Sequence, residues 1–124
     1  MWFLFMCLLL LGVLGAVVHG IVKSAANGSV RNNMLVGLRT PSTMASDEVW
    51  EAAHRSALPV TRVAAVAVPA AALVGVVLIV VTGREQVASG AALVCAGVLG
   101  VLTIVAGLRA HFAARSLLKG SRSS

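Results

Sequence analysis

Three long apolar runs without a charged side chain limit what this chain can fold into. They cover residues 1–22, 63–81 and 87–108, and none contains Lys, Arg, Asp or Glu. As α-helices, runs of about 19 to 22 residues would be about 28–33 Å long, enough to cross the hydrocarbon core of a bilayer. Only 11% of the 124 residues are charged, against roughly 25% in soluble domains. The sequence therefore predicts an all-α integral membrane protein with three transmembrane helices.

The chain is short enough to form a single membrane domain over residues 1–124. A polar insert, residues 23–62, separates the first two spans, and a basic tail, residues 109–124, follows the third. The first run has no positively charged segment before it and is longer than the apolar core typical of a signal peptide. We therefore interpret this run as a span and not as a cleaved signal.

The basic residues predict the orientation of the spans. Nine of the ten Lys and Arg residues lie in the insert or the tail, and only Arg84 lies between the second and third spans. By the positive-inside rule, the insert and the C-terminus face the cytoplasm and the N-terminus lies outside. Topology and attraction to anionic membrane lipid then explain the net charge of +6, so we expect no nucleic-acid partner.

Small residues recur every four positions in each span. Such stripes let helix backbones approach closely in lipid, so a compact bundle is expected. The stripes are Gly12, Ala16 and Gly20 in the first span, Ala67, Ala71 and Gly75 in the second, and Ala92, Ala96 and Gly100 in the third.

A short amphipathic helix is predicted in the second half of the insert. Ser46 is suited to the N-cap position, and two acids follow it in the first turn, where the helix dipole favours negative charge. Glu51 and Arg55 would form an i, i+4 ion pair. We expect this helix to lie along the inner leaflet, with Trp50 at the interface, and to lead into Pro59 and the second span. Its apolar face would consist of Val49, Trp50, Ala53 and Ala57.

The loop before this helix presents one arginine. Gly37 can adopt backbone angles closed to other residues, and Pro41 pushes Thr40 toward an extended conformation. Arg39 therefore projects from a stiff, non-helical loop near the membrane surface. Two roles stay open: Arg39 binds an anion, such as a lipid phosphate or a partner's carboxylate, or it ties the loop to an acid of its own helix. The acids considered are Asp47, Glu48 and Glu51, and the side chains suited to the loop's backbone groups are Asn33, Thr40, Ser42 and Thr43.

Histidines are the secondary candidates. His19 lies in the last turn of the first span, where it either handles protons or faces water at headgroup level. His54 lies near Glu51 but has no nucleophile or electrophile beside it, and His111 is expected to be an interfacial cation. The sequence contains no paired-carboxylate site within the spans, no Cys/His metal spacing, no phosphate-binding Gly loop and no nucleophile elbow. It therefore predicts no enzyme, no metal and no cofactor.

The ordered motif in the insert resembles the signature of the SdpI family, over about 23 residues. Members are small bacterial membrane proteins, named for an immunity protein against a secreted sporulation-delaying toxin. The resemblance implies a location in the bacterial plasma (inner) membrane and a binding role for the motif. The residues that carry it are Asn33, Gly37, Arg39, Thr40, Thr43 and Trp50.

Three hypotheses for the function follow. The first is an SdpI-type binding protein that confers immunity against a membrane-active toxin or senses it. The second is a small accessory subunit of a larger membrane transport or envelope-assembly complex, favoured by the small-residue stripes. The third is a small transporter with Arg39 and His19 as gate residues. A homo-oligomer is compatible with each of these hypotheses.

Overall fold

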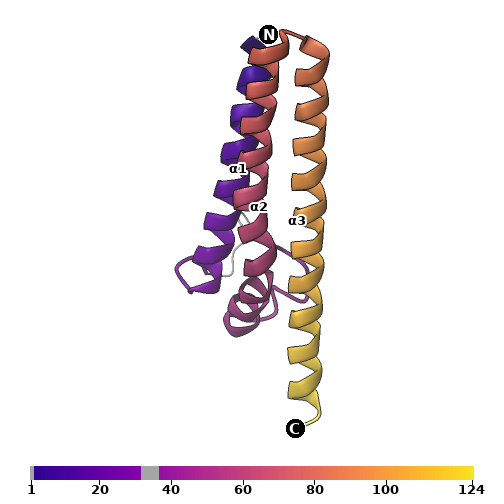
Figure 1. The fold of residues 1–124 in the computed structure, drawn as a ribbon. Helices are drawn as coiled ribbons and strands as arrows, with labels where there is room; N and C mark the ends of the chain where they lie inside the picture. The colour runs from indigo at the N-terminus through magenta and orange to yellow at the C-terminus, as the bar shows by residue number, and fades with distance from the viewer. Residues whose placement is uncertain (1, 32–36) are drawn as a thin grey trace.

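The computed structural model describes residues 2–31 and 37–124, and three α-helices account for most of them (Figure 1). They are α1 (Trp2–Ala26), α2 (Asp47–Thr82) and α3 (Glu85–Arg122), with no strand among the described residues. All three are long and apolar enough to cross a membrane. The expected all-α architecture with three such helices is thereby confirmed.

Helix α2 is the central element of the bundle. It packs against both α1 and α3, whereas α1 and α3 contact each other less extensively. Its direction is opposite to that of its two neighbours, so the segment between α1 and α2 lies toward the same end of the molecule as the C-terminus (Figure 1). The tight connection at the other end uses Gly83, whose positive φ of 62° caps α2 while its N–H bonds the Ile79 carbonyl at 2.8 Å.

Glycines set the distance between the spans. A Cβ atom at Gly15 would lie 2.9 Å from the carbonyl oxygen of Ala64, and one at Gly75 would lie 2.8 Å from the Ala91 Cβ. Both glycines are buried, and backbone or Cβ atoms of the facing helix occupy the space beside them. The helices therefore approach through missing side chains, as expected for association in lipid.

The contact stripes coincide only in part with the predicted ones. Gly12 and Gly75 are buried, as expected, whereas Ala16, Gly20, Ala96 and Gly100 are exposed. A straight four-residue stripe drifts around the helix because 3.6 residues make one turn, so the buried positions recur at a mixture of three, four and seven residues. The buried stripe of α2 is Thr61, Ala64, Val68, Ala72, Gly75 and Ile79, and that of α3 is Ala88, Cys95, Leu99, Ala106, Ala110 and Ala114.

The outward faces of the three helices are strongly apolar. Large side chains such as Val66, Leu93 and Ile104 are more than half exposed. Water would disfavour such a surface, whereas the hydrocarbon of a bilayer solvates it. This surface and the apolar runs together indicate a multi-pass membrane protein.

The expected short amphipathic helix is not a separate element. Helix α2 continues from Asp47 through Pro59 and Pro69 to Thr82. A proline inside a helix costs about 3 kcal/mol, but buried residues of α2 lie on both sides of Pro59, with Ala53 and Ala57 before it and Thr61 and Ala64 after it. At 36 residues α2 is about 54 Å long, longer than the roughly 30 Å hydrocarbon core, so part of it extends beyond the bilayer.

One cluster of buried apolar residues, called the second core below, lies where the three helices meet the Arg39 side of the molecule. It joins the end of α1, the first half of α2 and the second half of α3, and Leu38 packs against it. Helix α3 continues past this core to Arg122, which agrees with the helical tail expected from the sequence (Figure 1). The buried members of this core are Val22, Val49, Ala53, Ala57, Ala106, Ala110 and Ala114.

Candidate functional site

The N-terminal end of α2 forms as its sequence predicts. Ser46 is the N-cap, with its Oγ accepting a hydrogen bond from the Val49 N–H at 3.2 Å. Trp50, Ala53 and Ala57 are buried on one face, as expected. This anchored helix end is the support for the loop that precedes it, residues 37–45, called the Arg39 loop below.

Gly37 brings the Arg39 loop against α2. Its φ is +105°, in the region that favours glycine. A Cβ atom here would lie 2.8 Å from the Trp50 ring and 2.9 Å from Nε2 of His54. The motif glycine therefore serves both a backbone conformation and a close approach, and no other residue fits without moving the loop.

His54 binds the loop backbone directly. It is fully buried, its Nε2 accepts a hydrogen bond from the Leu38 N–H at 2.9 Å, and its Nδ1 lies 2.8 Å from the Trp50 carbonyl oxygen. A carbonyl only accepts and an amide N–H only donates, so the proton must lie on Nδ1. The geometry thus selects the neutral imidazole in one tautomer.

Burial also affects the charge state of His54. This residue precedes the apolar segment 63–81, and burial lowers its pKa from the ordinary value of about 6.5. The hydrogen bond to the Trp50 backbone opposes part of that decrease. His54 is therefore a neutral structural partner of the loop at neutral pH.

Trp50 is an internal packing residue and not the interfacial anchor expected from the sequence. Its side chain is fully buried, its ring centroid lies 4.1 Å from that of His54, and its Nε1 donates to the Val30 carbonyl at 2.9 Å. Gly37 approaches the ring, the Val30 carbonyl binds its Nε1 and no part of the side chain is exposed, so it contacts protein rather than lipid. Trp50 thereby joins α2 to the segments on both sides of residues 32–36.

A hydroxyl pair closes the other half of the Arg39 loop. The Thr40 N–H donates to Thr43 Oγ1 at 2.8 Å, and the Thr43 N–H donates to Thr40 Oγ1 at 3.2 Å. Thr43 is fully buried and its hydroxyl also reaches the Leu38 carbonyl at 3.0 Å. Thr40 Oγ1 lies 3.2 Å from Nδ1 of His111, which connects the loop to α3. His111 is therefore a partner of the loop and not only an interfacial cation.

Arg39 lies between these two attachments and is exposed. One role considered for Arg39 was a tie to an acid of its own helix. Among the described residues, neither Asp47, Glu48 nor Glu51 forms a hydrogen bond or ion pair with Arg39, so this tie is not seen. Asp47 instead pairs with Arg31 at 2.8 Å, which raises the pKa of Arg31. The exposed guanidinium of Arg39 carries five donors suited to a carboxylate or phosphate.

Two other predicted site residues lie apart from the loop. His19 contacts α2, with its Nδ1 3.0 Å from the buried Thr61 hydroxyl, so it joins two helices and is only half-buried. Asn33 lies outside the described residues. The predicted ion pair of Glu51 and Arg55 is present at 4.0 Å, and Arg55 also reaches the Ala26 carbonyl at the end of α1.

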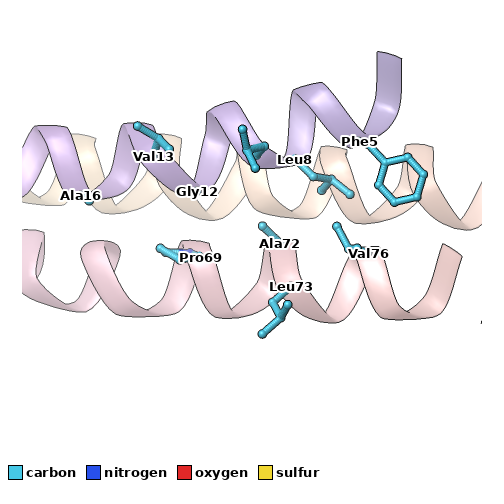
Figure 2. A pocket seen from close by; sticks show the side chains of 10 residues that line it. Phe5, Leu8, Gly12, Val13, Ala16, Pro69, Ala72, Leu73 and Val76 are labelled. Carbon is cyan, nitrogen blue, oxygen red and sulfur yellow. The ribbon is translucent and has the colours of Figure 1, made fainter. Parts of the chain in front are cut away.

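An apolar groove of about 550 Å³ lies between α1 and α2 (Figure 2). Gly12 has no side chain and lies opposite Pro69, whose Cα would be 3.5 Å from a Cβ at that glycine. The groove walls consist almost entirely of apolar atoms. They belong to Phe5, Leu8, Leu9, Gly12, Val13, Ala16, Pro69, Ala72, Leu73 and Val76.

Among the described residues, no cluster of three His, Cys, Asp or Glu side chains could hold a metal ion. Cys7 and Cys95 are both free thiols. What the site presents is one exposed guanidinium on a loop held on both sides.

The segment that builds this site also has known relatives. A family model described as the SdpI/YfhL protein family matches residues 29–110, from just before the Arg39 loop to the last third of α3. The chain belongs to this family. The resemblance seen in the insert is thus confirmed, and the matched region contains the whole motif. No curated protein and no solved structure matches the chain.

Sequence reasoning missed the partners of the motif residues. Neither the Leu38 amide nor the Val30 carbonyl carries a sequence signal, because every residue except proline has both groups. His111 lies 71 positions from Thr40. The one sequence signal for this contact is that His111 lies next to the buried face of α3 that includes Ala110 and Ala114. The motif was recognisable, but the contacts that explain it required the fold.

Proposed function

We propose that this member of the SdpI/YfhL protein family is a non-enzymatic membrane binding protein whose Arg39 loop binds an anionic group of a partner. The observation that carries the proposal is the exposed Arg39, without a partner among the described residues, on a loop held by His54 on one side and by the Thr40–Thr43 pair on the other. A loop backbone that is already held in place loses little conformational freedom on binding, which favours a specific contact of the guanidinium it carries.

We place the loop at the cytoplasmic face of a bacterial inner membrane, with the C-terminus on the same side and the N-terminus outside. Support comes from charge, since nine of the ten basic residues lie in the insert or the tail. The net positive charge would attract anionic lipid to this end. The family relation makes a membrane-active toxin the favoured protein partner, in an immunity or sensing role.

Capture from native membranes tests the binding role. Full-length protein and its Arg39→Ala variant are purified in mild detergent, and the co-purifying proteins are identified. Arg115→Ala removes an equal charge from an exposed position of α3 and is the matched control. We expect a partner with the wild type and with Arg115→Ala that is lost with Arg39→Ala. Equal capture by all three proteins would refute the role of Arg39.

Survival assays test the immunity role. Cells expressing the wild type should resist a membrane-active toxin made by sibling cells, and cells expressing Arg39→Ala should not, at equal protein levels in the membrane. A deletion strain with unchanged sensitivity to every such toxin would count against immunity, while leaving the capture result to decide on binding.

The apolar groove favours a second candidate function, an accessory subunit of a larger transport or envelope-assembly complex. The groove lies between two spans, where Gly12 leaves room for an apolar helix of another subunit. Gly12→Leu should then block co-purification of that subunit, while Arg39→Ala leaves it intact. A lone chain in mild detergent, with or without the substitution, would contradict this candidate.

A further inference from the structure

We propose that His54 positions the Arg39 loop only while its imidazole is neutral, and that protonation of His54 releases Leu38 and Arg39 from α2. The release is a property of the fold and stands by itself. Its consequence, a binding site at Arg39 that is lost in acid, rests on the proposed function.

The two hydrogen bonds of the His54 ring differ in direction. Nε2 of His54 is the acceptor for the Leu38 N–H at 2.9 Å, and Nδ1 already donates to the Trp50 carbonyl at 2.8 Å. Adding a proton can occur only at Nε2, where it would place an N–H against an N–H. The contact that holds the loop would become a repulsion between two donors.

The surroundings of His54 leave little room for another arrangement. His54 is fully buried, its ring lies against that of Trp50 at an angle of 44° with centroids 4.1 Å apart, and Gly37 approaches Nε2 closely enough to exclude a side chain. A charged imidazolium here would be buried and would find no second acceptor among the described contacts. Movement of the loop backbone would let water reach Nε2 and would relieve the cost of burying the charge.

The His54 ring has no charged partner among the described contacts. No described hydrogen bond or ion pair joins another ionisable side chain to the His54 ring. Burial alone dominates the decrease of its pKa, and no carboxylate compensates for a positive charge. The ionisable groups on the packed elements are Lys23 of α1, Arg31 and Arg39 of the connecting segment, Asp47, Glu48, Glu51 and Arg55 of α2, and Arg109, His111 and Arg115 of α3.

The position of the Leu38–His54 hydrogen bond explains how its loss would affect Arg39. Leu38 directly precedes Arg39, and the Thr40–Thr43 pair directly follows it. Breaking the Leu38 N–H bond removes the loop's hydrogen bond to His54, while the Thr43 hydroxyl still holds the Leu38 carbonyl and the hydroxyl pair and His111 keep the other side near α3. The backbone that carries Arg39 would then be less restricted, which raises the entropic cost of binding.

The sign of the pH dependence follows from the lowered pKa. The unfolded chain takes up a proton near pH 6.5, whereas folded His54 takes it up only at lower pH. The stabilising contact is therefore fully present above about pH 6.5 and is lost as the pH falls through the lowered pKa of the folded protein. At neutral pH the loop is attached.

Nuclear magnetic resonance of the full chain in lipid nanodiscs, without any partner, tests the release. Histidine labelled with ¹⁵N reports the tautomer and the titration of each ring, and hydrogen exchange reports protection of the Leu38 amide, corrected for intrinsic exchange at each pH. We expect the Nδ1–H tautomer at pH 7.5 and a midpoint below 6.5. Protection of Leu38 should fall by about tenfold or more over the same pH range, because a buried donor loses its acceptor.

His54→Gln is the variant for comparison, since it cannot titrate. Its Leu38 protection should show no dependence on pH between 7.5 and the acidic end point. If this variant does not fold, His19→Gln and His111→Gln assign the His54 signal by elimination. The test is then whether His54 titration and loss of Leu38 protection occur together in the wild type. An Nε2–H tautomer at pH 7.5, or titration of His54 with constant Leu38 protection, would overturn the proposal.

Partner capture at the same two pH values separates this proposal from the proposed function. Loss of Arg39-dependent capture together with Leu38 protection supports the regulatory consequence. Capture that stays constant while Leu38 is released overturns that consequence. Release of Leu38 in a protein that never shows Arg39-dependent capture supports the conformational step and contradicts the proposed binding function.

Discussion

At the scale of single residues, the Arg39 loop depends on one glycine, one imidazole and one pair of hydroxyls. Gly37 allows the loop to approach α2, His54 holds the Leu38 amide, and Thr40 and Thr43 satisfy each other's backbone groups. Each interaction alone is worth about 1 kcal/mol. Together they fix the two neighbours of Arg39 and so determine where the guanidinium is presented.

Gly37→Ala tests this arrangement. The substitution adds a Cβ within 2.9 Å of both rings at a φ of +105°, so we expect a loss of about 2–5 kcal/mol from strain and overpacking. Thermal unfolding in detergent provides the measurement. Gly83→Ala is the matched control, because Gly83 also has a positive φ but open space around it, and should cost only about 1–2 kcal/mol. Equal losses for the two variants would show that the close approach has no energetic weight.

The local chemistry of this region could be predicted, whereas its long-range contacts could not. The Ser46 cap, the buried face of Trp50 and the pair of Glu51 and Arg55 all follow from spacing within one helix. The interfacial position expected for Trp50 was wrong, because nothing local shows that Gly37 and Val30 cover its ring. Such contacts depend on how the loop returns to the helix.

At the scale of elements, the helices pack largely through small residues, with close approaches at Gly15 of α1 and Gly75 of α2. The sequence identified small residues as the contact surface, and Gly12 and Gly75 are buried as predicted, but the rest of the register was wrong in part, because Ala and Gly are so frequent that several stripes look equivalent. The helices also extend beyond the apolar runs, since hydropathy ends at the membrane boundary while hydrogen bonding and the second core continue the helix. The short helix expected to lead into Pro59 instead continues through it as part of α2.

A pair of alanine substitutions in α1 tests the observed register. Gly15→Ala places a Cβ 2.9 Å from the Ala64 carbonyl oxygen, so we expect a loss of about 1–3 kcal/mol as α1 moves away from α2. Gly20→Ala meets no atom within 4 Å and should be neutral or stabilising by up to about 1 kcal/mol, since alanine is the better helix former. Unfolding in denaturing detergent measures both variants. A larger loss at Gly20 would favour the stripe predicted from sequence.

At the scale of the whole molecule, charge and shape are arranged along one axis. The Arg39 loop, the second core and the C-terminal turns of α3 lie toward one end, and the α2–α3 connection lies at the other (Figure 1). The basic residues concentrate at the first end, which we propose faces the cytoplasm by the positive-inside rule. An anionic partner or lipid would therefore meet both Arg39 and a favourable long-range field.

Cysteine labelling tests this orientation. In a Cys7→Ser, Cys95→Ser background, single cysteines replace the exposed residues Gln86, Ala45 and Ser124. A membrane-impermeant thiol reagent added to intact cells should label only position 86, and all three positions should react after the membrane is opened. Labelling of positions 45 and 124 in intact cells, with position 86 protected, would reverse the orientation and place the Arg39 loop outside.

Site-specific photocrosslinking at the Arg39 loop tests the central claim most directly. A photoreactive residue replaces Ala45, an exposed loop position, in cells that express the full chain, with Ser116 on the exposed side of α3 as the control position. We predict one crosslinked product from position 45 that disappears when Arg39→Ala is added, and no such product from position 116. A product from position 45 that persists without Arg39, or the same product from both positions, would contradict binding through Arg39.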